Sequence, residues 1–463
     1  MRRDLRLHDN PALHRARAEF DVVIPVFILD DALLHGRYAS SPRAQFLFGC
    51  LRALDQELHA RGCGLVLRRG APEHELAKLA EQTGAGAVFW TSDVSPYALR
   101  RDRAVTAALQ ERGVRAVPNT GTYARDVSKV RKDDGEMYTV FTPYWKAWER
   151  LAARDIYGAP RAMAPLPRGL DRGELPGGVR APGGTLGAPV CEPGEAAGRE
   201  ALTRWLDGPV DRYGDRHDTL AGGTSVLSPY LRWGCLSARE CELRARRRGT
   251  PGADAWVRQL AWRDFYASVL LEHPENVRRE FQPKFRSLSW HEDADALDAW
   301  KRGETGFPIV DAGMRQLAAT GWMHNRARMV VGSFLTKDLH LDWRAGEQHF
   351  AALLLDGEPA QNNGNWQWIA STGVDPAPYF RRIFNPILQQ RKFDPDGAYV
   401  RRWVPELAAV PDNRLAEPWT MTEAEQRDAR CAIGLDYPAP IVDHADERKR
   451  AMDRYREASA GVA

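Results

Sequence analysis

The sequence of 463 residues lacks the features that mark membrane and secreted proteins. No apolar run approaches the ~20 residues that a membrane-spanning helix needs. No basic start followed by an apolar stretch resembles a signal peptide. The six cysteines include no C-x-x-C pair and form no dense framework. We therefore expect free thiols in a reducing cytoplasm, and no membrane partner.

A strong charge imbalance and a metal-ligand pattern are absent as well. The formal net charge is only +3, so binding to nucleic acid would depend on basic residues that cluster locally. His324 has no second His or Cys at metal-ligand spacing, and we expect no metal site.

The first 125 residues alternate strand and helix patterns. Apolar runs typical of strands and amphipathic stretches typical of helices follow one another over residues 22–29, 43–61, 64–67, 72–83, 87–91, 96–112 and 115–117. This order predicts an α/β domain with a parallel sheet and crossover helices. The chain opens on M-R-R-D-L-R, so the first strand of that sheet is apparently missing.

Composition divides the remaining chain into three parts. Residues 126–195 are predicted to be an interdomain linker, because Gly and Pro dominate from 158 to 194. Residues 196–415 show helical periodicity, and twelve of the 15 Trp lie after residue 200. This pattern predicts an all-helical domain built around aromatic contacts. Residues 416–463 are predicted to be a peripheral C-terminal tail.

The segment 356–380 combines amides, indoles and turn-forming residues more densely than any other stretch. Asn362 and Asn363 lie in an amide-rich turn, and Trp366 and Trp368 follow within six residues. Such a group suits a flat aromatic ligand with polar edges. A buried aromatic turn in a helical core would give the same composition.

The run G-G-T-S-V-L-S-P at residues 222–229 has the pattern of a helix start, with Ser228 as N-cap and Pro229 at the first helical position. Free N–H groups and hydroxyls at such a turn can hold a phosphate. Most such turns only cap a helix, so this alternative stays open here.

Two further helices carry mixed aromatic and polar faces. Gln259, Trp262, Arg263 and Tyr266 share one face at spacings of three, four and seven residues. That face suits a ligand wall or contact with nucleic acid, although a half-buried helix face has the same pattern. His324, in G-W-M-H-N-R-A-R, is by itself more typical of a structural than of a catalytic histidine.

Taken together, these motifs closely resemble the photolyase and cryptochrome flavoproteins. R-R-D-L-R-L-H-D-N-P-A-L resembles the opening motif of that family, and T-S-V-L-S-P-Y-L-R-W-G its flavin-phosphate loop. Q-L-A-W-R-D-F-Y, T-G-F-P-I-V-D-A-G-M-R-Q-L, G-W-M-H-N-R-A-R-M, D-W-R-A-G-E, N-N-G-N-W-Q-W and F-N-P-I-L-Q-Q follow in the order and spacing of the family. The resemblance implies a Rossmann-like antenna domain followed by a helical domain that binds FAD.

The resemblance also implies roles for single residues. Cofactor contacts fall on Tyr213, Thr224, Ser225, Val226, Leu227, Ser228, Arg263, Arg328, Asp356, Gly357, Glu358 and Asn362, with Asn362 facing flavin N5. The electron chain to the flavin falls on Trp366, Trp343 and Trp290, from the inside outwards. Contacts with DNA or with the lesion fall on Gln259, Trp262, Asn325, Arg326, Met329, Trp368 and Gln389.

The implied activity is light-driven repair of DNA. Reduced FAD gives an electron to a flipped-out pyrimidine dimer, the cyclobutane ring splits, and the electron returns. A second, light-harvesting chromophore, deazaflavin or methenyltetrahydrofolate, is implied near Arg43 and residues 29–38. The partner is damaged DNA, and a monomer is expected.

Two departures from the family pattern stand out. Gln259 lies where cyclobutane photolyases commonly have Glu, and the first strand of the family's sheet is apparently missing before R-R-D-L-R. Glu358 also lies where an Asp is common. The forms G-W-M-H-N-R and W-Q-W are nevertheless most like the class I cyclobutane enzymes. The alternative function is a cryptochrome-like sensor of blue light without repair activity.

Overall fold

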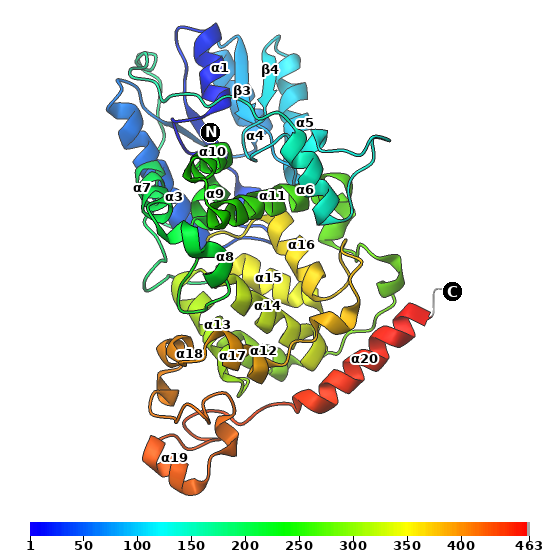
Figure 1. Ribbon diagram of the computed structural model, residues 1–463. Helices are drawn as coiled ribbons and strands as arrows, with labels where there is room; N and C mark the ends of the chain where they lie inside the picture. Colours follow the sequence, from blue (N-terminus) through cyan, green and yellow to red (C-terminus); the bar gives the residue numbers. More distant parts are fainter. Residues whose placement is uncertain (461–463) are drawn as a thin grey trace.

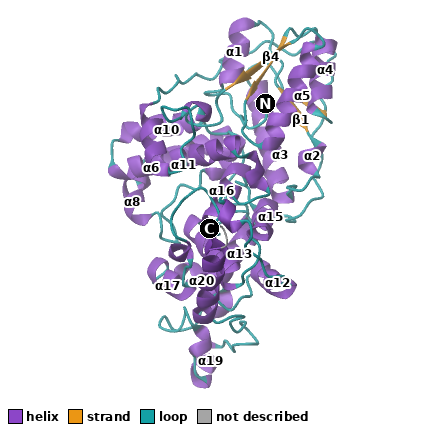
Figure 2. Cartoon of the chain, turned by 90° about the vertical axis from the view of Figure 1, so that its right-hand side faces the viewer, coloured by secondary structure: helices purple, strands orange, loops and turns teal. Residues whose placement is uncertain are grey.

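The computed structural model describes residues 1–460 (Figure 1). An α/β part at the top of the view lies on a larger helical part, which extends down to α19. Seen from the side, the strands are confined to the upper part and helices make up nearly all the rest (Figure 2). The predicted order of an α/β domain before a helical domain is therefore confirmed.

The strands form two parallel pairs. β1 (Val26–Leu29) pairs with β2 (Val66–Arg69), and β3 (Ala87–Thr91) pairs with β4 (Arg115–Asn119). The start of the chain connects the two pairs, because the amino group of Met1 donates to Val26 O at 2.9 Å and Arg2 Nε donates to Thr91 O at 2.7 Å.

The boundaries of these elements follow from Pro and from helix caps. The expected strand 22–29 begins only at residue 26, because Pro25 lacks the N–H that a ladder requires. Ser40 and Ser95 accept hydrogen bonds from the third residues of their helices. The helices of this part are α1 (Pro11–Glu19), α2 (Asp31–Leu34), α3 (Ser41–His59), α4 (Pro72–Thr83) and α5 (Pro96–Gln110).

The segment 126–195, predicted as a linker, contains the 3-10 turn η1 (Val127–Lys129) and an α-helix that packs on the helical part. Helix α6 (Phe141–Arg150) buries Phe141, Tyr144 and Trp148, and it contacts α11. Residues 158–194 contain no helix or strand.

The helical part is arranged around the long helix α11. Its elements up to the tail are α7 (Glu195–Leu206), α8 (Tyr213–Arg216), α9 (Ser228–Trp233), α10 (Ala238–Arg248), α11 (Pro251–Glu272), α12 (Ala294–Arg302), α13 (Pro308–Thr320), α14 (Asn325–Ser333), the π-helical turn η5 (Phe334–Asp338), α15 (Trp343–Leu353), α16 (Pro359–Ile369), α17 (Pro386–Phe393) and α18 (Ala398–Trp403). Two glycines allow α16 to approach its neighbours. A Cβ at Gly364 would lie 2.2 Å from the Tyr266 ring of α11, and one at Gly346 of α15 would lie 2.2 Å from the Trp366 ring.

The C-terminal residues form α19 (Glu423–Ala429) and α20 (His444–Ala460), and α20 lies against the rest of the helical part. Tyr455 is fully buried and its hydroxyl donates to Ala370 O at 2.6 Å. His444 contacts Asp338 at 2.5 Å. Among residues 1–460, no helix has both the length and the apolar character needed to span a bilayer.

Candidate cofactor and DNA site

The Asp356 carboxylate, just before α16, accepts hydrogen bonds from other parts of the helical domain. Asp356 Oδ2 accepts hydrogen bonds from Ser228 Oγ at 2.6 Å and from Arg328 Nη2 at 2.8 Å. Trp322 Nε1 donates to Ser228 Oγ at 3.3 Å. The other oxygen, Asp356 Oδ1, is buried without a protein partner within residues 1–460, so it can accept a hydrogen bond from a ligand.

The loop before α9 has unused backbone donors. Gly223 and Val226 have φ of +83° and +52°, a left-handed conformation that is unusual for a β-branched residue. Within the described chain, the N–H groups of Thr224, Ser225, Val226 and Leu227 donate to no protein acceptor. The Ser225 hydroxyl accepts from Trp256 Nε1 at 3.3 Å. N–H groups that are free at a turn before a helix suit an anion such as a phosphate.

Tyr213 and Gly357 lie at opposite ends of this arrangement. Tyr213 begins α8, and its half-buried ring meets Trp205 edge-on at 5.9 Å. Gly357 O accepts from Arg232 Nε at 2.9 Å, and a Cβ at Gly357 would lie 2.7 Å from Arg43 Nη1. The tip of the Arg43 side chain of α3 thus lies against the start of α16.

Glu358 and Arg263 are bound to the protein on several sides. Glu358 pairs with Arg3 at 2.6 Å and with Arg263 at 3.0 Å, and it accepts from the Tyr123 hydroxyl at 3.0 Å. Burial opposes ionisation of Glu358, but Arg263 and Arg3 outweigh it and lower its pKa to about 2. These contacts join the two domains, and they commit both side chains to an ion cluster.

Asn362 lies one turn into α16, beside a buried acid. Its Nδ2 donates to Glu347 O at 2.9 Å. Burial raises the pKa of the Glu347 carboxyl to about 7. Both residues line a cavity between the domains.

Two half-buried indoles lie beside the contact between α11 and α16. Trp262 lies one turn before Tyr266 on α11, and Trp368 lies one turn after Gly364 on α16. The guanidinium of Arg382 covers one face of Trp368 at 4.2 Å from the ring centre, and Trp368 Nε1 donates to Asp375 Oδ2 at 3.0 Å.

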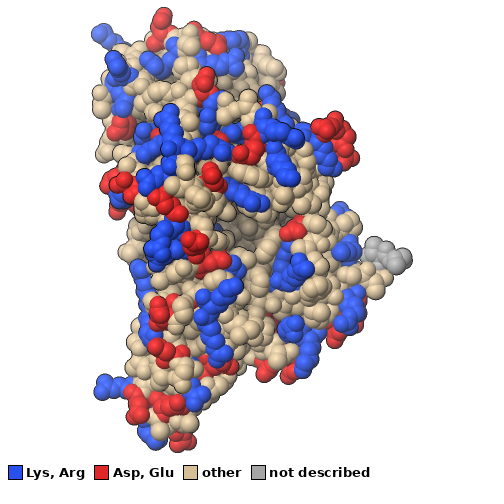
Figure 3. All heavy atoms as spheres, in the orientation of Figure 1, with Lys and Arg blue, Asp and Glu red and all other residues tan. Residues whose placement is uncertain are grey.

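Figure 3 shows that the molecule is hollowed near the centre of this face, over the region that α8, α11 and α16 occupy in Figure 1. Lys and Arg side chains gather above and beside the hollow (Figure 3). Gln259 is exposed on α11, one turn before Trp262. Basic groups around a hollow suit a nucleic acid, whose phosphates they can bind.

The remaining side chains predicted to contact DNA differ in exposure and in whether the protein already binds their polar atoms. Asn325 is exposed and its Nδ2 lies 3.8 Å from Met329 Sδ on the next turn. Arg326 is held by Asp218, with Nη2 to Oδ2 at 2.6 Å. Gln389 Oε1 is buried without a partner in the described residues, so it has a free acceptor.

His324 caps α14 through Nδ1, which accepts from Arg326 N at 3.1 Å. The ring proton therefore lies on Nε2, which is buried and has no acceptor within residues 1–460. Burial lowers the pKa of His324 to about 4, so the ring is neutral at physiological pH.

The three tryptophans of the predicted electron chain run from the core to the surface. Trp366 and Trp343 are buried, and Trp290 is half-buried. Helix α15 connects the first two, because Trp343 begins it and Gly346, one turn on, touches Trp366. Trp343 Nε1 donates to Glu280 Oε1 at 3.3 Å. His291, the neighbour of Trp290, bonds through its backbone N–H to His340 O just before α15.

Comparison with known proteins extends over the whole chain. A family model described as DNA photolyase matches residues 1–167, and one described as the FAD binding domain of DNA photolyase matches residues 256–457. A deoxyribodipyrimidine photo-lyase of Streptomyces griseus is 45% identical over 453 residues, which cover 96% of each chain. The chain belongs to the DNA photolyase family.

Solved structures of the family have the same fold as this photolyase. A bacterial class III photolyase from Agrobacterium tumefaciens matches with a TM-score of 0.92 at 35% identity, covering 99% of this chain and 97% of the other. A cryptochrome from Synechocystis matches with a TM-score of 0.90 at 28% identity, covering 98% and 97%. An archaeal photolyase from Sulfolobus tokodaii, solved with two FAD molecules, matches with a TM-score of 0.84 at 31% identity, covering 99% and 98%.

The residues of this photolyase fit FAD, the cofactor of the matched domain. The free N–H groups of Thr224–Leu227 suit a diphosphate, and the unpaired Asp356 Oδ1 suits a hydroxyl or N–H donor. The sequence motifs pointed to both elements. They did not reveal the donation from Trp322 to Ser228, nor the pairing of Glu358 with Arg3 and Tyr123.

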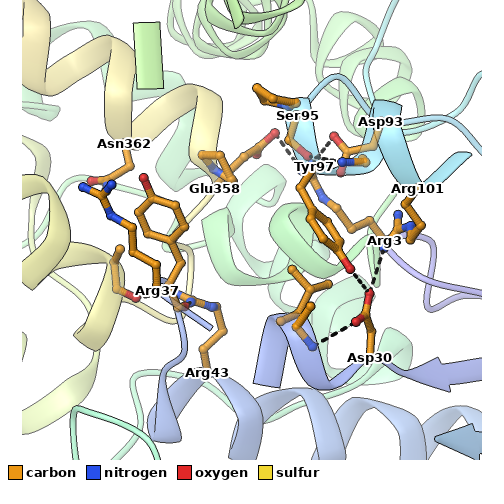
Figure 4. Close-up of a pocket in the computed structure, with 18 of the residues that line it drawn as sticks. Arg3, Asp30, Arg37, Arg43, Asp93, Ser95, Tyr97, Arg101, Glu358 and Asn362 are labelled. Carbon is orange, nitrogen blue, oxygen red and sulfur yellow. Dashed lines mark hydrogen bonds and ion pairs between the residues drawn. The ribbon is translucent and has the colours of Figure 1, made fainter. Parts of the chain in front are cut away.

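A separate cavity of about 890 Å³ lies between the two domains of the photolyase. Asp30, Tyr97 and Arg101 line one side and Glu358 and Asn362 the other (Figure 4). The Tyr97 hydroxyl donates to Asp30 Oδ2 at 2.5 Å.

Arg43 lines this cavity as predicted for the antenna region, but its guanidinium is used by the protein. It donates to Ala351 O at 2.6 Å and also to Tyr38 O. Arg232 Nη1, which borders the same cavity, is buried without a partner in the described residues. A ligand here could therefore accept a hydrogen bond from Arg232.

Proposed function

We propose that this photolyase splits cyclobutane pyrimidine dimers in DNA by using light. The observation that carries the proposal is the pair of half-buried indoles, Trp262 and Trp368, beside the helix that begins at the cofactor residues Asp356–Glu358. A dimer inside a duplex cannot reach such a pocket, so it must be flipped out, and a damaged base is flipped at lower cost because it stacks poorly.

Reduced FAD, when bound, supplies the light-excited electron that splits the dimer. Thr224, Ser225, Val226 and Leu227 hold its phosphates through their N–H groups, and Asp356 accepts from it while Ser228 and Arg328 fix the carboxylate. The Gly357 carbonyl, which accepts from Arg232, fixes the backbone beside Asp356.

The lesion is held by the walls and polar groups of the hollow. Trp262 and Trp368 stack on the flipped bases, since base–indole stacking is favourable with any base. The Gln259 amide donates a hydrogen bond to a base carbonyl and stabilises charge that develops there. Asn325, Arg326, Met329 and Gln389 contact the lesion and its backbone, and the basic rim binds phosphates.

We infer that Trp290, Trp343 and Trp366 conduct electrons from an external reductant to the interior. Trp290 is the half-buried end that a reductant can approach, and the other two indoles lie in the dry core. Trp343 lies beside the ion pair of Glu280 and Arg344, whereas Trp366 is packed among apolar side chains.

The interdomain cavity is the proposed site of a second, light-harvesting chromophore. Deazaflavin, a folate or a second flavin would each meet the free Arg232 donor and the Asp30–Tyr97 pair. The enzyme is expected to act as a monomer.

A second candidate function is blue-light sensing without repair. Gln259, in place of the common Glu, and the similarity to the Synechocystis cryptochrome favour it. Both functions use the same cofactor, so only a test of whether the protein repairs a DNA lesion distinguishes them.

The deciding experiment is repair of a thymine-dimer oligonucleotide under blue light by the reduced, FAD-loaded enzyme. Restoration of the undamaged bases in light and not in darkness supports repair. Absence of repair by an enzyme with full flavin absorbance would support the sensor. An enzyme that binds no FAD would contradict both.

A further inference from the structure

The indole of Trp262 is stacked on an aromatic ring from the segment between the domains. The rings of Phe141 and Trp262 lie parallel, with centroids 3.7 Å apart and an interplanar angle of 8°. Phe141 is the first residue of α6, far from α11 in the sequence. Only 6% of Phe141 is exposed, so it lies on the protein side of the indole. One face of Trp262 is thus covered, and only the opposite face can receive a base.

Phe141 is itself fixed by α11. Its ring meets the edge of Phe265 at 5.9 Å and 75°, and the guanidinium of Arg258 lies 5.3 Å from its ring centre. Phe265 also meets the edge of Trp262 at 5.6 Å. Phe141 therefore fills the space between two aromatic residues of one helix, and a shift of α6 would be felt directly by the indole.

The second indole, Trp368, has an analogous arrangement. Arg382 covers one face of Trp368 at 4.2 Å and pairs with Asp375, which accepts the indole N–H. Each indole is thus held from behind by a side chain of another segment. A wall that is fixed before the base arrives loses less conformational entropy when the base stacks on it.

We propose that Phe141 is a positioning residue, which fixes the plane of Trp262 for the flipped pyrimidine dimer. The inference rests on the proposed function, in which Trp262 contacts the lesion. It gives the segment between the domains a role in distinguishing damaged from undamaged DNA, beyond connecting the two domains.

The test compares Phe141→Leu and Phe141→Tyr with the wild type, all loaded with FAD. Loss of the aromatic stack should weaken binding to a dimer-containing oligonucleotide by about three- to tenfold. Binding to the undamaged oligonucleotide and flavin content should stay unchanged, because neither depends on the indole plane. Phe141→Tyr keeps the ring and should restore discrimination. Affinities are measured by fluorescence anisotropy in the dark.

Tyr144→Leu is the matched control for the packing of α6. Tyr144 is a buried aromatic residue of the same helix that meets Phe265 at 5.1 Å, and no ring contact joins it to Trp262. It should keep discrimination. Equal loss in Tyr144→Leu and Phe141→Leu would overturn the proposal, as would full discrimination in Phe141→Leu. If Phe141→Leu does not fold, Phe141→Met decides in its place, because the Met side chain is unbranched and flexible and can fill the space of the Phe ring without stacking.

Trp262→Ala separates this inference from the proposed function. If Trp262→Ala loses discrimination and Phe141→Leu retains it, only the role of Phe141 is wrong. If the wild type does not discriminate, or Trp262→Ala equals the wild type, the lesion assignment itself is wrong and the inference falls with it.

Discussion

Arg3, near the start of the chain, forms an ion pair of 2.6 Å with Glu358, the residue that precedes the cofactor helix α16. Arg263 and the Tyr123 hydroxyl bind the same carboxylate, and all four residues are buried. The antenna domain is thus bound directly to the helix that carries Asn362 and Trp366. The Glu358 carboxylate therefore contributes both to domain association and to the position of the start of α16.

Glu358→Gln should therefore destabilise the protein by about 3–5 kcal/mol at neutral pH, because buried Arg263 loses its carboxylate and buried Arg3 keeps only its pair with Asp93. Since the pKa of Glu358 is lowered to about 2, its stabilisation is present above the ordinary carboxyl pKa and is lost as the pH falls toward 2. The difference from wild type should shrink on acidification. Chemical unfolding at several pH values measures it. The exposed pair of Glu200 and Arg204 gives the control, and Glu200→Gln should cost at most about 1 kcal/mol.

Glu347→Gln should show the opposite pH dependence. The pKa of Glu347 is raised to about 7, so the folded protein keeps this proton while the unfolded chain loses it, and stability falls as the pH rises toward 7. The variant has no such group, and it should gain up to about 3 kcal/mol relative to wild type between pH 5 and pH 8. Thermal unfolding at both pH values checks this. Glu275→Gln, which changes an exposed acid on the same cavity, should leave the pH dependence as it is.

Asp356→Asn should weaken FAD binding by about tenfold or more, because the single amide oxygen of Asn cannot accept from Ser228, Arg328 and a ligand as the two carboxylate oxygens can, and the charge opposite Arg328 is lost. The ratio of flavin to protein absorbance after dialysis reports the loss. Asp396→Asn, an exposed change on the loop before α18, is the control. Wild-type flavin content in Asp356→Asn would contradict the assignment of the cofactor site.

Trp366→Phe should abolish light-driven reduction of bound oxidised FAD and leave repair by chemically reduced enzyme largely intact. The substitution removes one indole from the proposed route and touches no lesion contact. The absorbance of the flavin under illumination with an external reductant follows the reaction. Trp300→Phe is a close control, because Trp300 is equally buried and meets Trp366 edge-on at 6.2 Å without belonging to the route. Equal rates in wild type and Trp366→Phe would show that electrons travel elsewhere.

Gln259→Glu should raise the quantum yield of cyclobutane dimer repair. A carboxyl group can hydrogen-bond to the dimer carbonyl and, when protonated, stabilises developing negative charge more strongly than an amide. Affinity for undamaged DNA should barely change, because it depends mostly on phosphate contacts. The yield per absorbed photon is measured with fully reduced enzyme. An unchanged or lower yield would reopen the cyclobutane assignment, and the pair would then be compared on the pyrimidine–pyrimidone lesion.

The sequence was sufficient for features that depend on neighbouring residues. The pattern over 96–112 predicts the start of α5 at Pro96, and the G-G-T-S run predicts a turn with free donors. Each of these signals is contained in a few consecutive positions, so local stereochemistry determines the result. The prediction of Ser228 as N-cap was wrong, because Ser228 is the first residue of α9 and its hydroxyl donates to Asp356 instead.

Contacts between residues far apart in the sequence could not be predicted from such local patterns. Tyr123 and Glu358 are 235 positions apart, and no periodicity relates them. The charged composition of α20 indicates a peripheral tail, yet its buried residues His444, Glu447, Ala451 and Tyr455 form one inward stripe. Their partners lie on other helices, so only the folded chain reveals the contact.

The cavity between the domains also has a thermodynamic consequence. A molecule bound there touches α3 on one side and α15 and α16 on the other, so separation of the domains would release it. Its binding is therefore linked to folding, and the unfolding temperature should rise with the concentration of free chromophore according to mass action. Preparations with different chromophore occupancy should differ in heat resistance even when their polypeptides are identical.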